Sequence, residues 1–158
     1  MKDYIKIRIL QGTLALISLV GMWVFDSTYI WIGLAAYAFF ETFGGNIGLH
    51  RYFCHRSFTT SLLIRRFLLF CSHYIAVGSV LSWVGQHRWH HDHSDTELDQ
   101  HSPYTRPLHE IFFGVWEMNI PRKYVKDVVK DKELVWWHKH YWHLHLILFA
   151  VYCVIGFE

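Results

Sequence analysis

The chain has 158 residues, a length that ordinarily forms one domain. Hydrophobic residues make up 53% of it and aromatic residues 18%, which is too apolar for an average soluble domain of this size. The formal net charge is only +2, so charge gives no reason to expect nucleic-acid binding, and the apolar runs favour lipid instead. The three cysteines have no CxxC spacing and predict neither a disulfide framework nor a thiolate zinc site.

Two apolar stretches near the start predict a transmembrane helical hairpin. Residues 9–25 and 29–49 each approach the roughly 20 residues that span a bilayer, and polar residues 26–28 form a turn between them. Basic residues flank the hairpin: Lys2, Lys6, Arg8, Arg51, Arg56, Arg65 and Arg66. The positive-inside rule therefore places both ends on the cytoplasmic side. Glu41 interrupts the second stretch, so it either faces a partner or a cavity or lies close to the interface.

A third apolar stretch, residues 62–83, separates two histidine clusters, 50–55 and 87–91. If this stretch crossed the membrane, the clusters would lie on opposite sides and could not share a site. We therefore expect it to be an interfacial or re-entrant segment.

The rest of the chain is expected to be mostly cytoplasmic. Residues 84–140 are polar and charged, and the lysine- and aspartate-rich residues 124–133 predict a solvated helix. Residues 143–157 are again mostly apolar, which predicts the start of a further transmembrane span. Four aromatic residues stand just before it, where an aromatic belt would lie: Trp136, Trp137, Tyr141 and Trp142.

The histidine clusters predict a metal site. His87, His90 and His91 stand at i, i+3 and i+4, which places them on one face of a helix. Imidazole suits zinc, copper, iron and nickel, so the ligand type alone does not select the metal. On an ideal α-helix the five-residue step from His50 to His55 is about 140° off one face, so we expect one of the pair at a helix end. Nearby acids either orient the metal ligands or form a solvated acidic loop: Asp92, Asp95, Glu97 and Asp99.

Two longer motifs carry a resemblance to a known family. The stretch 48–58, which contains His50-Arg51-Tyr52-Phe53-Cys54-His55-Arg56-Ser57-Phe58, resembles the first histidine box of the membrane fatty acyl desaturases. The stretch 83–103, which contains His87-Arg88-Trp89-His90-His91, resembles the second. The likeness is closest to the acyl-CoA, delta-9 (stearoyl-CoA-like) branch, whose pattern is HRxxxHRSF followed by HRxHHxxSxTxxDPH. Gln100 replaces the usual proline of that pattern.

The resemblance implies an all-α integral membrane fold with a transmembrane stem under a cytoplasmic cap. It implies a non-heme di-iron site that uses dioxygen and two electrons to introduce a double bond into a fatty acyl chain, carried as acyl-CoA or acyl-lipid. An external electron donor of the ferredoxin or cytochrome b5 type is implied as well. The residues that match the family's iron ligands are His50, His55, His87, His90 and His91.

The chain also departs from the family pattern. A third box, HxxHH, is not found in these residues, and the spacing of His138, His140, His143 and His145 does not fit it. We expect those four beside the aromatic belt, His73 in the core and His109 at the surface. Residues 1–158 are thus interpreted as a single partial domain, either an N-terminal part or a chain whose missing ligands come from a second polypeptide. The alternatives are a fatty acid or alkane hydroxylase on the same scaffold, and a non-catalytic metal-binding or assembly protein.

Overall fold

The computed structural model describes residues 27–99, 101–108, 111 and 120–155, and also residues 6, 9, 11–14, 16, 17, 20 and 21. Every regular element within these ranges is a helix, which confirms the all-α prediction for that part of the chain. Eight of the 17 residues of the expected first span (10, 15, 18, 19 and 22–25), together with Gln100 and His109, fall outside the described residues.

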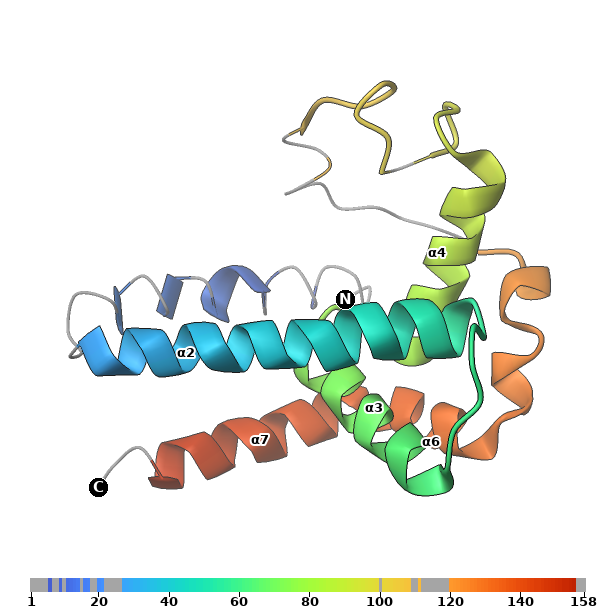
Figure 1. Ribbon diagram of the computed structural model, residues 1–158. Helices are drawn as coiled ribbons and strands as arrows, with labels where there is room; N and C mark the ends of the chain where they lie inside the picture. Colours follow the sequence, from blue (N-terminus) through green and yellow to red (C-terminus); the bar gives the residue numbers. More distant parts are fainter. Residues whose placement is uncertain are drawn as a thin grey trace.

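The second apolar stretch forms the longest structural feature. Helix α2, Ser27–Phe40, continues into η1, Glu41–Cys54, and the two form one rod in Figure 1. The second half is a π-helix, with hydrogen bonds from i to i+5, a form that is rare and frequently found at functional sites. In the described part of the chain we find no helix that combines the length and the apolar character needed to cross a membrane.

Small residues bring η1 close to the next helix. Helix α3, Leu62–Tyr74, begins at an N-cap, Ser61, whose side chain accepts a hydrogen bond from the Ile64 N–H. A Cβ atom on Gly44 would lie 2.4 Å from a main-chain oxygen of α3, and one on Gly48 would lie 2.4 Å from the Ser72 hydroxyl. That hydroxyl donates a 2.9 Å hydrogen bond to the Gly44 carbonyl oxygen. The two helices can therefore meet this closely only because these positions lack side chains.

The third apolar stretch turns between two helices. It bends after α3 at residues 75–79, where Gly78 has a φ of 112° and Ser79 caps the start of α4, Val80–His93. The Gly78 N–H donates to the Tyr141 hydroxyl, which ties this turn to the last helix. Helix α4 rises away from the rod in Figure 1, with its first turns beside the end of η1. The bend places the second histidine cluster beside the first.

The lysine- and aspartate-rich segment differs from its prediction. It forms two short 3-10 helices, η2 (Arg122–Val125) and η3 (Val128–Lys130), and then α6, Lys132–Lys139. The prediction of one solvated helix over residues 124–133 was therefore wrong. Tertiary contacts explain the difference, because Tyr124 and Val128 are buried and the segment wraps around the Arg88 side chain. The last helix, α7, spans Tyr141–Ile155.

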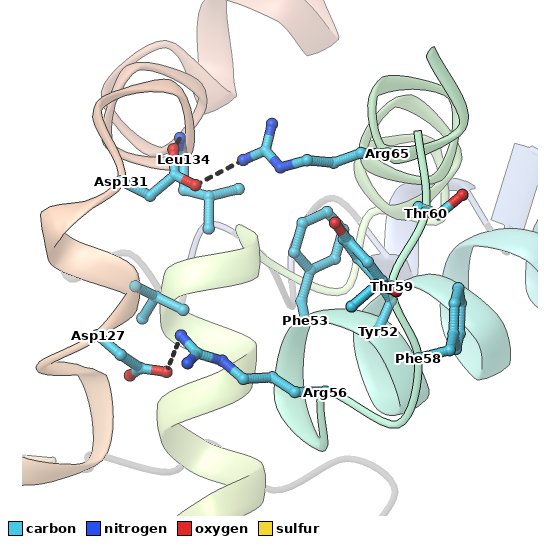
Figure 2. Close-up of a pocket in the computed structure, with 11 residues that line it drawn as sticks. Tyr52, Phe53, Arg56, Phe58, Thr59, Thr60, Arg65, Asp127, Asp131 and Leu134 are labelled. Atoms are coloured by element: carbon cyan, nitrogen blue, oxygen red, sulfur yellow. Dashed lines mark hydrogen bonds and ion pairs between the residues drawn. The ribbon is translucent and has the colours of Figure 1, made fainter. Parts of the chain in front are cut away.

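Ion pairs hold this segment against the first half of the chain. Arg88 on α4 makes two hydrogen bonds to the Asp127 carboxylate, of 2.7 and 3.0 Å, and a third, of 3.0 Å, to the Cys54 carbonyl oxygen. Arg56 and Arg65 pair with Asp127 and Asp131 at 2.6 and 2.7 Å across a cavity of about 390 Å³ (Figure 2). The buried apolar core under these contacts contains Leu49, Phe53, Leu68, Leu69, Val84, Val128 and Leu134. It fixes the end of η1 against α4, which is where the histidines lie.

Candidate metal centre

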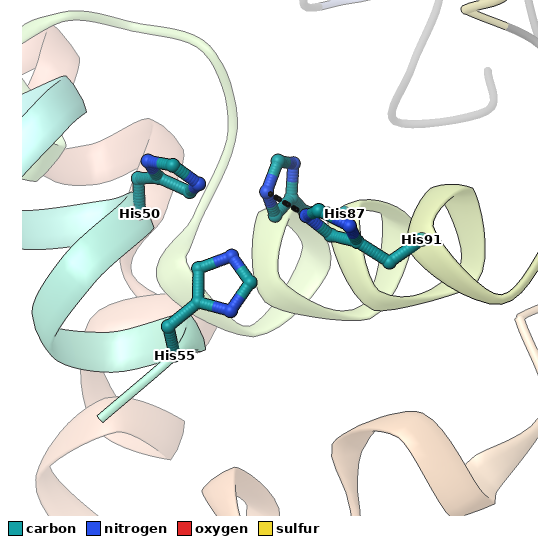
Figure 3. Close-up of side chains that lie close together, drawn as sticks. All are labelled: His50, His55, His87 and His91. Carbon is teal, nitrogen blue, oxygen red and sulfur yellow. Dashed lines mark hydrogen bonds between the residues drawn. The ribbon is translucent and has the colours of Figure 1, made fainter. Parts of the chain in front are cut away.

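Four histidines from the two motifs converge on one point. The potential ligand atoms of His50, His55, His87 and His91 all lie within 4.8 Å of one another. Figure 3 shows two of these rings reaching from the end of η1 and two from α4. The structure therefore brings together four of the five histidines that sequence reasoning assigned to iron.

The π-helix explains how the first motif supplies two of them. In a helix with i to i+5 hydrogen bonds, residue i+5 lies about one turn after residue i, so the two side chains project from nearly the same face. The His55 N–H accordingly donates to the His50 carbonyl oxygen at 3.0 Å, and the two ring centroids are 4.7 Å apart. His55 is the C-cap of η1, as expected for one member of the pair. The pair shares a face because of the π turn, which periodicity based on an α-helix did not predict.

Helix α4 supplies the other pair at ordinary α-helical spacing. The Nε2 atoms of His87 and His91, one turn apart, are separated by 3.0 Å. Trp83, one turn earlier, stacks on the His87 ring at 4.5 Å between centroids. Burial, followed by the nearby imidazoles, lowers the pKa of His87 to about 3. Burial and the neighbouring rings of His50 and His91 also lower the pKa of His55. These two imidazoles are therefore neutral near pH 7 and keep a nitrogen lone pair for a metal.

His90 points to a different neighbour. Its Nδ1 lies 2.8 Å from the carboxylate of Asp99, which is fully buried. Burial by itself raises the pKa of Asp99, but hydrogen bonds from the His101 N–H, His90 and the Asp95 N–H outweigh it and hold that pKa below its usual value. A carboxylate that fixes one nitrogen of a histidine leaves the other ring nitrogen available for a metal. Of the four acids that the sequence suggested, Asp99 is thus the one that contacts a cluster-motif histidine in this way.

The four-histidine cluster fits a transition-metal ion. Imidazole nitrogens bind such ions at about 2.0–2.1 Å, so ligand atoms on opposite sides of one ion are about 4.2 Å apart. The observed limit of 4.8 Å is close to this value, and small side-chain rotations would close the difference. The donors are nitrogens only, which agrees with iron, zinc, copper or nickel and disfavours magnesium or calcium.

Two cavities of different character adjoin the cluster. One, of about 240 Å³, contains His50 and His87 and has mostly apolar walls, among them Leu49, Ile75 and Trp83. The other, of about 440 Å³, contains His55 and His91 and is lined by charged and polar side chains: Arg88, Asp92, Lys123 and Tyr124. The four-histidine cluster therefore adjoins a mostly apolar cavity through His50 and His87, and a polar cavity through His55 and His91.

The remaining singled-out histidines lie elsewhere. His73 is buried against Trp137, Tyr141 and His145, which agrees with the core position expected for it. The Nδ1 of His138 lies 2.6 Å from the Ser79 hydroxyl. No residue of the HxHxxHxH run belongs to the metal-compatible group found among the described residues.

Sequence reasoning missed two contributions to the site. The first is the Arg88–Asp127 pair. Arg88 also donates a hydrogen bond to the Cys54 carbonyl oxygen and so holds the end of η1 in place. It could not be found from spacing because its members are 39 residues apart. The second is the cavity wall formed by the turn between α3 and α4, including Ile75 and Val77.

Comparisons with known proteins agree with the motif resemblance. The chain is 33% identical over 137 residues to a hex-5-enoyl-(acyl-carrier protein) acetylenase of Moorena producens (strain JHB), covering 78% of this chain and 42% of that protein. It is 29% identical over 139 residues to an sn-1 stearoyl-lipid 9-desaturase of Anabaena variabilis, covering 82% and 51%. It is 35% identical over 95 residues to an acyl-CoA 5-desaturase of Anemone leveillei, covering 60% and 30%. No protein-family model and no solved structure matches the chain.

These similarities make the chain a distant homologue of the membrane fatty acid desaturases. Relatives named for different positions and products match at similar identity, so the similarity does not single out the delta-9 branch. The chain spans from 30% to 51% of the length of these three relatives.

Proposed function

We propose that this chain carries part of the metal centre of a membrane non-heme di-iron oxidoreductase that introduces a double bond into a fatty acyl chain. The observation that supports this most strongly is the cluster of four imidazoles, built from the two motifs that resemble desaturase histidine boxes. We further assign the chain to the delta-9 branch, which acts on acyl-CoA or acyl-lipid. This assignment rests only on the amino-acid sequence of the two histidine motifs. It is tested by the position of the double bond in the product.

We assign His50, His55, His87 and His91 to one iron. His90 lies outside that group and is oriented by Asp99, so we assign it to a second iron, for which the described residues form no further metal-compatible group. When bound, such iron would supply the oxidising chemistry that dioxygen and two electrons make possible. The protein would orient the ligands through Asp99 and the π turn, position the acyl chain and keep water out.

We assign the apolar cavity to the acyl chain. It adjoins two of the proposed iron ligands and its walls are aliphatic or aromatic, as an unactivated methylene chain requires. We assign the opposite, polar side to the approach of a separate electron carrier of the ferredoxin or cytochrome b5 type. The side chain of Lys123, which lines that side, is 68% exposed, and cationic groups of this kind steer acidic partners.

We further propose that the chain is embedded in a membrane with its histidines on the cytoplasmic side. Large apolar side chains are exposed on α2 and on α7, among them Trp31, Ile32, Leu34, Leu146 and Ile147. Exposed apolar patches of this kind mark contact with lipid or with another protein. Protein that stays in the membrane pellet through alkaline carbonate extraction would support this proposal. Release into the supernatant would contradict it.

Metal analysis tests the central proposal. The purified chain is loaded anaerobically with ferrous iron, and bound iron is measured after desalting for the wild type and for the double variant H87A/H91A. We expect the double variant to lose the iron, because it removes half of the cluster. The variant H143A is the control, because His143 is exposed and outside the group.

Iron that survives in H87A/H91A would contradict the site assignment. Product analysis of the iron-loaded protein with an acyl substrate and an electron donor tests the reaction. A hydroxylated product would favour the hydroxylase alternative over the desaturase.

A further inference from the structure

The apolar cavity contains one acidic side chain that the proposed reaction does not use. Glu41 lines this cavity together with Asn46, while most of the wall is apolar. Both residues are on η1, and steps of five residues along a π-helix, from 41 to 46, remain near one face. The sequence placed Glu41 inside an apolar stretch and left open whether it faces a cavity; the structure places it in one.

The carboxylate of Glu41 is directed along the helix toward the histidines. A Cβ atom on Gly45 would lie 2.6 Å from Oε1 of Glu41, so the carboxylate occupies the space that a side chain at position 45 would need. Position 45 is five residues, or about one π turn, before His50. The carboxylate therefore lies roughly one helical turn from a proposed iron ligand, on the wall of the same cavity.

This carboxylate has no hydrogen-bond or ion-pair partner among the described side chains and main-chain groups. Its neighbour Asn46 uses its amide N–H to donate to the Glu41 carbonyl oxygen, at 3.4 Å, which leaves the amide oxygen of Asn46 as a second acceptor. The Glu41 carboxylate is thus the one anionic acceptor among the residues that line this cavity. Glu41 is half-buried and its oxygens are not among the fully buried polar atoms that lack a partner, so a ligand that donates a hydrogen bond would replace water at this carboxylate.

We infer that Glu41 selects an acyl chain that carries a hydroxyl group near the carbons that react. A hydroxyl donates one hydrogen bond and costs far less to remove from water than an ammonium group, so it suits a cavity whose other walls are apolar. This inference rests on the proposed function, because it takes the apolar cavity as the acyl site. It adds the substrate class and a specificity-determining residue.

The experiment compares two probes that differ by one hydroxyl. Octadecanoic acid and 12-hydroxyoctadecanoic acid compete with a fluorescent fatty acid for the iron-loaded chain in detergent micelles. A hydrogen bond to a charged group contributes about 1.5–3 kcal/mol, so wild-type protein should prefer the hydroxylated probe by about tenfold or more. E41L should abolish or reverse this preference, whereas E41Q should keep part of it through its amide oxygen. T42V, a change at an exposed position outside the cavity lining, is the control and should behave as wild type.

The outcomes separate this inference from the proposed function. If the chain binds iron and both probes, but E41L leaves their affinity ratio unchanged, the inference about Glu41 is overturned and the acyl site stands. If the chain binds iron and neither probe displaces the fluorescent fatty acid, the acyl site and this inference fail together. A preference that depends on Glu41 and not on Thr42 supports both.

Discussion

The contact between η1 and α3 makes a quantitative prediction for Gly44→Ala. The added methyl group would lie 2.4 Å from the carbonyl oxygen and 2.5 Å from the carbonyl carbon of Cys71. These are main-chain atoms inside a helix and cannot rotate away, so the helices must separate. Gly33 on α2 is the matched control, because a Cβ atom there meets nothing within 4 Å.

The magnitude follows from three contributions. Overpacking of this kind costs about 1–3 kcal/mol. Separating the helices also weakens the hydrogen bond from Ser72 to the Gly44 carbonyl oxygen, which contributes about 1 kcal/mol. Alanine recovers about 0.5–1 kcal/mol because it loses less backbone entropy than glycine in a helix. The net destabilisation of Gly44→Ala is therefore about 1–3 kcal/mol, whereas Gly33→Ala should stabilise by about 0.5–1 kcal/mol.

Thermal unfolding followed by circular dichroism in micelles measures both changes. For a chain of this size each kcal/mol shifts the midpoint by about 2–4 °C, so a loss of 2 kcal/mol lowers it by about 4–8 °C. Iron retention should fall as well, since His50 follows Gly44 on the same helix. If Gly44→Ala melts at or above the wild-type temperature while Gly33→Ala behaves as expected, the close contact between η1 and α3 is wrong.

Three further variants test other contacts. Arg88→Lys keeps the charge but cannot form the paired hydrogen bonds to Asp127, so urea unfolding should show a loss of about 1–2 kcal/mol; an unchanged midpoint would argue against the pair. Asp99→Asn places an amide N–H among the groups that donate to Asp99, and it should cost about 1–3 kcal/mol and loosen the orientation of His90; retention of wild-type stability would contradict that hydrogen-bond network. Burial, with a nearby imidazole, lowers the pKa of His73 from its ordinary 6.5 to about 3, so between these values the unfolded chain binds a proton that the folded chain does not. Stability should therefore fall by up to about 2 kcal/mol between pH 7.5 and 5, and His73→Phe should flatten that loss; equal pH slopes for the two proteins would refute the burial of a neutral histidine.

The sequence by itself determined the helical class and the chemistry of the site. Apolar runs of span length and i, i+3, i+4 spacing depend only on local periodicity, and the imidazoles of the two motifs carry their chemistry wherever they lie. The flanking residues of His50 and His87 were also enough to indicate the desaturase resemblance, which the comparisons then supported at 29–35% identity. The sequence also required that residues 62–83 not cross a membrane if the two motifs were to meet.

Tertiary structure decided which histidines meet and what surrounds them. The π turn that aligns His50 with His55 is visible only once the main-chain hydrogen bonds are known, because an α-helical pattern predicts the opposite. The bend before Ser79 and the Arg88–Asp127 pair bring α4 to the end of η1, and both depend on contacts between distant residues. His90 points to Asp99 and away from the other four histidines, and the Glu41 carboxylate points toward Gly45. Both orientations depend on side-chain packing, which the spacing of residues along the sequence does not predict.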